Sequence, residues 1–466
     1  MTNGKHLELV RGLGAWTSAA IVVGTMIGTG IFLKPAEMAA DAGSVVIVFA
    51  AWIVGGGLSL FGALAFAELG AAIPEVGGEY AYLRRGLGPM WGFLFGWMHS
   101  IVGRPASMAS IAAGLLRFCA FLVPALAAPI YTRQISMPLS HAPYAFIFTW
   151  AQPLAVAALV ALTFINYLGV RIGGRVQVIL TIIKVTSVAA IIILAFALAR
   201  PGGAGFHPFL PSSYSAATLT GFFGALAASL WAYDGWEDLN LVGSEVEDPQ
   251  RNIPRALILG VLFCSAIFML FSAASHWVLP FAALARSEHV ASDVVASISG
   301  RNAALWVTLA MAVSALGTLN ASTLSGARVP YAMARDGIFF RKTAEIHPRF
   351  RTPAGALVFE CVLASVLALT GTFEDLTSLF IFAAWIFYGL AVVAMMRLRR
   401  VEADLPRPYR CWGYPWVPVA FVMGAVALTI TLWLARPVRS SIGLALILSG
   451  LVFYRNWRKK LSTPAG

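Results

Sequence analysis

The chain has 466 residues, of which 59% are hydrophobic and only 12% are charged, and its mean hydropathy is +0.79. These values exclude an ordinary soluble protein and indicate a chain that crosses a membrane many times. The net charge of +12 could suit a nucleic-acid partner, but the positions of the basic residues, described below, favour a topological origin.

Apolar runs of about 20 residues are long enough to cross a bilayer as helices. The sequence therefore predicts an all-α membrane protein with twelve transmembrane helices, at about residues 15–33, 45–70, 90–123, 152–168, 175–199, 219–243, 255–279, 303–332, 354–371, 376–396, 416–434 and 441–455.

The first span contains the stretch GTMIGTGIF, from Gly24 to Phe32, where three glycines weaken the helix. Irregular backbone inside a membrane is tolerated only where it is buried in protein or lines a polar cavity. A break here would leave free carbonyls on the inner half-helix and free N–H groups on the outer one, a pair of surfaces that suits a zwitterion. A closely packed face of small residues is the alternative interpretation.

The sixth span contains WAYDGWEDLN, from Trp231 to Asn240, with Gly235 and three acidic residues. A carboxylate near the middle of a membrane is costly unless it is paired or faces water. This favours a second broken helix. We read Asp234 as a cap for N–H groups where the helix resumes, with pairing to a cationic substrate as the alternative.

Two broken helices five spans apart indicate a five-plus-five inverted repeat, in which each repeat opens with a broken helix. The predicted organisation has two repeats, two peripheral helices and connecting segments: a cytoplasmic N-terminus at 1–14, the first repeat at 15–199, an outer loop at 200–218, the second repeat at 219–396, a cytoplasmic loop with the last two spans at 397–456, and a cytoplasmic C-terminus at 457–466.

The basic residues place both termini in the cytoplasm. With that orientation, 22 of the 33 Lys and Arg residues lie in cytoplasmic segments, seven in outer segments and four within spans. This is the positive-inside bias of a multi-pass protein of the cell membrane. We therefore expect the lipid bilayer, and no nucleic acid, as the partner of this chain.

The sequence offers little for catalysis or metal binding. Its four cysteines show no CxxC spacing and its histidines are scattered, so neither a metal site nor a cofactor is expected. We find no nucleophile elbow, phosphate loop or HExxH pattern. A membrane enzyme or a channel is the rival class, but the spans lack convergent catalytic groups, and a site fitted to a zwitterion argues against an open pore.

The chain resembles the amino acid–polyamine–organocation superfamily and, within it, the L-amino acid transporter family. The resemblance runs through nearly the whole chain and is carried by these stretches: GTMIGTGIFLKP, LAFAELGAAIPEVGGEYAYLRRGLGPMWGFLFGW, RPAS at 104–107, VILTIIKV, WAYDGWEDLNLVGSEVEDPQRNIPRAL and GTLNASTLSGARVPYAMARDG. It implies a secondary transporter of amino acids, not an enzyme, that works by alternating access.

By resemblance, the substrate carboxylate meets Gly28, Thr29 and Gly30, and its ammonium meets carbonyls of Met26 or Ile27 and of Trp231, Ala232 and Asp234. Trp231 corresponds to an aromatic lid and Trp385 to the side-chain pocket, although either tryptophan taken alone would more often be a core residue. For Arg104 a structural role and a transport role stay equally open.

Lys184 is the only lysine near the middle of a span, where an unpaired ammonium is expensive. It must contact polar groups, and we expect the broken backbone of the first span and the hydroxyls of Ser322, Thr323 and Ser325. The resemblance implies that this lysine replaces a bound sodium ion, so sodium-independent transport is expected, with Lys184 as the coupling residue.

We expect neutral L-amino acids as substrates, with cationic ones as the alternative. In animal relatives of the family, a cysteine in the outer loop between the third and fourth spans pairs with a glycoprotein. The corresponding loop, at about 124–151, contains no cysteine, so no disulfide-linked heavy subunit is expected.

Overall fold

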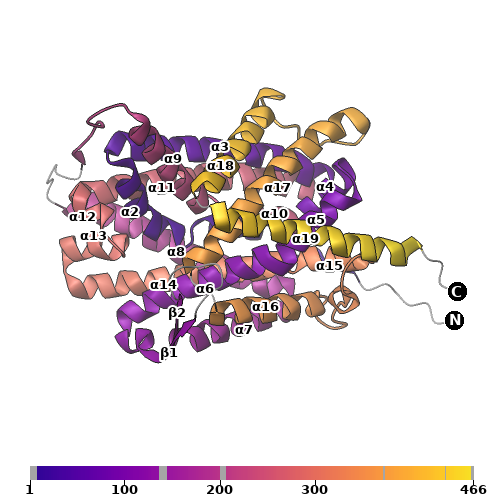
Figure 1. Ribbon diagram of the computed structural model, residues 1–466, viewed down its shortest axis with the longest axis horizontal. Coiled ribbons are helices and arrows are strands. Elements are labelled where there is room, and N and C mark those ends of the chain that lie inside the picture. The colour runs from indigo at the N-terminus through magenta and orange to yellow at the C-terminus, as the bar shows by residue number, and fades with distance from the viewer. Residues whose placement is uncertain (1–7, 136–143, 200–205, 371–372, 436, 463–466) are drawn as a thin grey trace.

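The computed structural model describes residues 8–135, 144–199, 206–370, 373–435 and 437–462. It is a bundle of helices with one small two-stranded hairpin (Figure 1). Within the described residues, eight helical stretches are long and apolar enough to cross a membrane, and four shorter apolar helices have 10–17 residues.

The first part of the chain contains the following elements: α1 (Ala15–Met26), α2 (Gly30–Ala42), α3 (Val45–Ala72), α4 (Glu79–Gly86), α5 (Pro89–Met98), the π-helical turn η1 (His99–Gly103), α6 (Arg104–Leu122), β1 (Pro129–Ile135), β2 (Tyr144–Thr149), α7 (Ala151–Tyr167) and α8 (Val170–Leu198).

The second part contains these helices: α9 (Ala216–Ala232), α10 (Asp238–Leu241), α11 (Pro249–Val278), α12 (Phe281–Ala285), α13 (Val290–Ser299), α14 (Arg301–Gly326), α15 (Arg328–Arg335), α16 (Ala354–Thr370), α17 (Phe373–Val401), α18 (Trp416–Ala435) and α19 (Pro437–Ser462).

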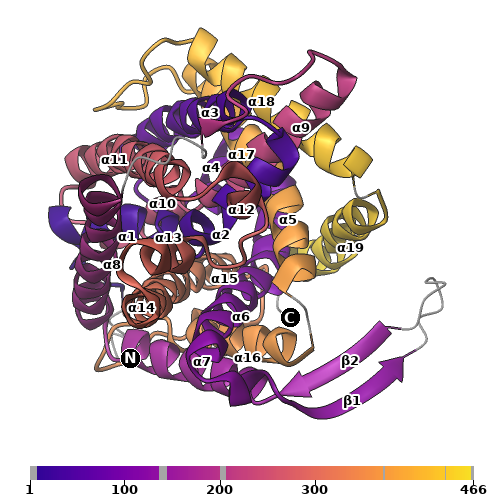
Figure 2. The same cartoon turned by 90° about the vertical axis from the view of Figure 1, so that its left-hand side faces the viewer.

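Figure 2 looks along the bundle, with α1 and α10 towards its centre and α18 and α19 at its rim. The burial of the apolar helices follows this arrangement: 78% of the most apolar window of α1–α2 is buried, against 28% for α18. The first broken helix is therefore largely shielded by protein, which is the setting that irregular backbone requires in a membrane.

The helices follow the predicted spans closely, and the first and sixth spans are each interrupted, between Met26 and Gly30 and between Ala232 and Asp238. Several short elements of the described chain lie outside the predicted spans, including α4. The antiparallel hairpin β1–β2 occupies the loop before α7, and the short helices α12 and α13 follow α11. These elements are too short to cross a membrane.

The segment before α1 is joined to the segment after α10 by backbone hydrogen bonds. The N–H groups of Gly12 and Leu13 donate to the Glu245 carbonyl at 2.9 and 3.0 Å, and the Glu247 N–H donates to the Leu13 carbonyl at 2.9 Å. We call these two short segments, residues 12–13 and 245–247, the N-terminal clasp. The Glu245 carboxylate is buried against Arg328, with contacts of 2.7 and 3.0 Å, so α15 is tied to the clasp as well.

Candidate functional site

The break in the first span exposes opposite ends of two helices to each other. α1 ends at Met26 and α2 begins at Gly30. The first N–H groups of α2 have no partner within their own helix, as at any helix start, and they carry the positive end of its dipole. Donors therefore gather at Thr29 and Gly30, where a carboxylate would be stabilised.

Lys184 lies on the α1 side of this break. Its ammonium donates to the carbonyls of Gly24 and Ile27, both at 2.7 Å, and to the hydroxyl of Thr318 at 3.1 Å. Lys184 is completely buried. It therefore takes the position that a bound cation would take among these oxygens.

The prediction that Lys184 contacts the broken backbone agrees with this geometry, but the predicted hydroxyl partners are wrong. Thr318 makes the contact, one helical turn before Ser322. Thr323 and Ser325 instead donate to carbonyls of their own helix, at 2.8 and 3.0 Å. The reason is helical phase: Ser314, Thr318 and Ser322 share one face of α14, and Ser314 also donates to the Ile27 carbonyl, at 3.3 Å.

The break in the second broken helix lies directly against the first. Gly235 has a φ of 100°, which favours glycine, and a Cβ there would lie 2.8 Å from the Cβ of Thr25. The Thr25 hydroxyl donates to the Gly235 carbonyl at 2.7 Å. This contact joins the end of α1 to the second irregular segment across 210 residues of sequence.

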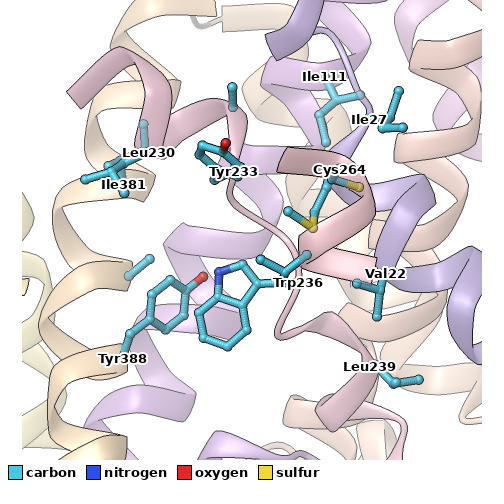
Figure 3. Packing of buried hydrophobic residues seen from close by; sticks show 14 of the residues in the cluster. Val22, Ile27, Ile111, Leu230, Tyr233, Trp236, Leu239, Cys264, Ile381 and Tyr388 are labelled. Carbon is cyan, nitrogen blue, oxygen red and sulfur yellow. The ribbon is translucent and has the colours of Figure 1, made fainter. Parts of the chain in front are cut away.

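Asp234 has a different role from the predicted helix cap. Its carboxyl oxygen contacts the hydroxyl of Tyr388, on α17, at 3.2 Å. α10 starts only at Asp238, and no side chain caps its N-terminus. Figure 3 shows Tyr388 reaching from α17 towards Trp236 and the irregular segment after α9. The acid is therefore held by a neighbouring helix, which the local sequence could not indicate.

Arg104 forms a buried ion pair with Asp238, including one contact of 3.2 Å. Its Nε also donates to Nε2 of His99 at 3.3 Å. Arg104 thus holds the first residue of α10 and does not cap broken backbone. Breaking such a buried pair by removing one partner costs about 3–5 kcal/mol in typical cases.

A cavity of about 60 Å³ lies between the two breaks, with room for a few water molecules. The residues that line it come from α1, α2, α6, α9, α10, α14 and the irregular segments: Thr25, Met26, Gly28, Thr29, Gly30, Arg104, Ser107, Ser110, Ile111, Trp231, Ala232, Asp234, Gly235, Glu237, Asp238, Thr318 and Ser322.

Seven of the nine predicted binding residues line this cavity, and two do not. Ile27 is fully buried and its carbonyl accepts from Lys184 and Ser314. Trp385 is 1% exposed and its ring stacks on Phe421, with ring centroids 5.8 Å apart. In this conformation both belong to the walls behind the cavity.

Trp231 lies in the last turn of α9 at the rim of the cavity, and a charged residue of α2 lies over it. The Lys34 ammonium is 4.9 Å from the centroid of the Trp231 ring, and it also forms an ion pair with Glu37. A Cβ at Gly30, one helical turn before Lys34, would lie 3.0 Å from the Trp231 ring. The indole therefore packs against one face of α2.

Several residues of this region had not been identified from the sequence, notably Tyr388, Glu79, Thr25 and Thr318. Threonines on a helix face that already carries other hydroxyls are a usable signal, whereas a lone tyrosine in an apolar span is not. Among the described residues no group of three His, Cys, Asp or Glu side chains could hold a metal ion.

Comparison with known proteins gives consistent relationships over the full length. Residues 13–454 match the family model described as amino acid permease. The chain is 32% identical to the human b(0,+)-type amino acid transporter 1, over 99% of this chain and 92% of the relative. It is 31% identical to the serine/threonine exchanger SteT of Bacillus subtilis, over 97% of this chain and 98% of the relative.

The human large neutral amino acids transporter small subunit 2 is 30% identical over 97% of this chain and 81% of its own length. Relatives that are named for different substrates thus have nearly the same sequence identity to this chain. The predicted resemblance and the prediction of a transporter rather than an enzyme are confirmed. The chain belongs to the amino acid permease family and is an amino acid transporter of its L-amino acid transporter branch.

Proposed function

We propose that this chain carries one amino acid at a time in the cavity between the two helix breaks. The carboxylate meets the N–H groups around Gly28, Thr29 and Gly30, and the ammonium meets carbonyls of Met26, Trp231, Ala232 and Asp234. The observation that carries this proposal is the cavity itself, which places helix-start donors of α2 opposite the end of α9.

We further propose that the twelve spans form two five-helix repeats of opposite orientation, at 15–199 and 219–396, with both termini in the cytoplasm of a cell-membrane protein. The peripheral position of α18 and α19 supports the assignment of the last two spans as additions to the repeats (Figure 2). Transport then proceeds by alternating access, with one repeat rocking against the other around the cavity.

Neutral L-amino acids are the proposed substrates. Two relatives are named for neutral substrates, the large neutral amino acids transporter and the serine/threonine exchanger. Cationic amino acids are the second candidate, because Asp234, Glu237 and Asp238 all line the cavity and only Asp238 is paired with an arginine.

The test is uptake of labelled L-leucine, L-serine and L-arginine into proteoliposomes containing the purified chain. Loading the vesicles with unlabelled amino acid separates exchange, which requires internal substrate, from uptake, which does not. Saturable uptake of leucine or serine supports the proposal. Uptake of arginine alone would favour the cationic alternative, and its loss in Asp234→Asn would assign the selectivity to that carboxylate. Absence of saturable uptake of all three would contradict the proposal.

A further inference from the structure

A single hydroxyl lies between two carboxyl groups at the edge of the cavity. The Tyr388 oxygen is 3.2 Å from Oδ1 of Asp234 and 2.5 Å from Oε1 of Glu237. We call these three side chains the carboxyl bridge; Figure 3 shows the hydroxyl end of Tyr388 facing the segment that bears both acids.

The hydrogen count of the bridge leaves room for an additional proton. A phenol has one hydrogen to donate and otherwise only accepts, and an ionised carboxylate only accepts. Tyr388 can therefore donate fully to one of the two acids. The contact with the other acid becomes a hydrogen bond when that acid is itself protonated and donates to the phenol oxygen.

The charged groups around the bridge also favour one additional proton on the two acids. Helix α6 contributes Arg104, whose guanidinium forms an ion pair with Asp238 of α10. From η1, His99 accepts at Nε2 from Arg104, so its proton is on Nδ1 and the ring is neutral. From α4, Glu79 adds a further buried carboxyl group. Helices α3 and α18 contribute the aromatic rings of Phe66 and Phe421.

Burial makes two charges on the bridge expensive. Glu237 is 3% exposed, and its Oε2 accepts only a 3.2 Å bond from the Gly235 N–H in addition to the tyrosine contact on Oε1. Asp234 is partly buried and lines the cavity. Two ionised carboxylates that share one neutral donor repel each other in such a place, which favours a shared proton.

The bridge is reached from two cavities. Asp234 and Glu237 line the 60 Å³ cavity, while Glu237 and Tyr388 also line a second cavity of about 10 Å³, together with Glu79 and His99. A space of that size holds one water molecule. Oε2 of Glu79 and Nδ1 of His99 have no hydrogen-bond partner among the described residues, so a water there would have polar groups to bind.

We propose that the carboxyl bridge is a proton-binding site and that a bound amino acid displaces its proton. This rests on the proposed function, because the substrate ammonium must reach the cavity next to Asp234. As the ammonium arrives, the carboxyl O–H bond breaks, the proton passes to water, and the positive charge of the substrate replaces that of the proton. Binding therefore releases a proton.

The test is isothermal titration of the purified full chain in detergent with L-leucine, L-serine and L-arginine in turn. Each titration is made at pH 7 in two buffers that differ in their enthalpy of protonation. The difference in binding heat between the buffers gives the number of protons released. We expect release of up to one proton per amino acid bound, and an affinity that rises with pH by at most tenfold per unit.

Variants assign the proton to the bridge. Glu237→Gln and Asp234→Asn keep the shape of each side chain and should reduce the number of protons released. Tyr388→Phe removes the hydroxyl that contacts both acids and should change that number as well. Glu402→Gln, at an exposed ion pair with Arg85, serves as the control and should release as many protons as the wild type. If one bridge variant does not fold, the other two still assign the proton, and equal binding heats of the wild type in both buffers would still overturn the proposal.

Each remaining outcome is decisive. Equal binding heats in both buffers, with clear binding, would overturn the proton site and leave the proposed function standing. A binding heat for none of the three amino acids would contradict the proposed function itself, and the proton site with it. Unchanged release in Asp234→Asn and in Glu237→Gln would place the proton elsewhere.

Discussion

Gly30 has no space for a side chain. A Cβ at this position would lie 3.0 Å from the Cα of Ala232 and from the Trp231 ring, so α2 and α9 approach each other at the cavity through this glycine. We predict that Gly30→Val abolishes amino acid uptake, because the added methyl groups would fill the place of the substrate carboxylate and separate the two helices.

Thr29→Ala is the milder change at the same site. It removes one hydroxyl while the backbone donors remain, and one hydrogen bond is worth roughly 0.5–1.5 kcal/mol, so we expect a reduction in uptake of a few fold. Gly57→Ala is a suitable control because nothing lies within 4 Å of a Cβ at Gly57. Equal, mild effects of Gly30→Val and Thr29→Ala in proteoliposomes would count against a site built from backbone.

Lys184 connects α8 with α1 and α14 through the carbonyls of Gly24 and Ile27 and the hydroxyl of Thr318. We predict sodium-independent uptake, in which this ammonium sets the energy difference between the inward- and outward-facing states. Lys184→Ala should fold in detergent but slow turnover, or change the affinity on one membrane face.

A hydrogen bond to a charged group contributes about 1.5–3 kcal/mol, so a turnover rate that depends on only one of the three bonds should fall by at least roughly tenfold in Lys184→Ala. The measurement is uptake with and without a sodium gradient, for the wild type and Lys184→Ala. A strict requirement for sodium, or wild-type rates in the variant, would show this mechanism to be wrong.

At the scale of elements, α2 and α9 pack closely against each other at two places. Near the cavity, Lys34 lies over the Trp231 ring. Further along, Asp41 packs against Gly221 and Gly224, where a Cβ would approach its carbonyl and carboxyl oxygens to 2.3 and 2.7 Å. We therefore expect α2 and α9 to move together.

We predict that Lys34→Gln raises the apparent KM for external amino acid about two- to fivefold while Lys34→Arg does not. A cation over an indole contributes roughly 0.5–2 kcal/mol, and arginine can replace lysine there. Lys34 is largely covered, with 14% of its side chain exposed, whereas Glu37 is half exposed and its ion pair should contribute little. Glu37→Gln is thus the control, and an equal KM in all three variants would refute the role of Lys34.

The sequence predicted the helices well because length and hydropathy determine a membrane span locally. It also located both breaks, since glycines and acids inside an apolar run are local signals. It did not predict which faces of the helices meet. Asp234 contacts Tyr388 from a helix 154 residues away, and Lys184 contacts Thr318 rather than Ser322, Thr323 and Ser325, because rotation of packed helices depends on tertiary contacts.

At the scale of the whole molecule, none of the four cysteines is fully exposed to a partner protein that could form a disulfide. Cys264, Cys361 and Cys411 are buried, and Cys119, at the end of α6, is half-buried. The hairpin β1–β2 follows α6 and contains no cysteine. We predict that the purified single chain transports amino acids at full rate in proteoliposomes. A strict requirement for a second subunit would contradict this prediction.

The N-terminal clasp is made of main chain, and this has a consequence for genetics. Its hydrogen bonds join main-chain carbonyls, which every residue has, to main-chain N–H groups, which every residue except proline has. An alanine scan of residues 12–13 and 245–247 would therefore test the packing of side chains and leave these hydrogen bonds intact. At the exposed Glu247, alanine keeps the N–H that reaches Leu13, and proline deletes it. A screen by alanine substitution would therefore find that position 247 accepts the change. Glu247→Pro, in contrast, should weaken the attachment of the segment before α1 to the segment after α10.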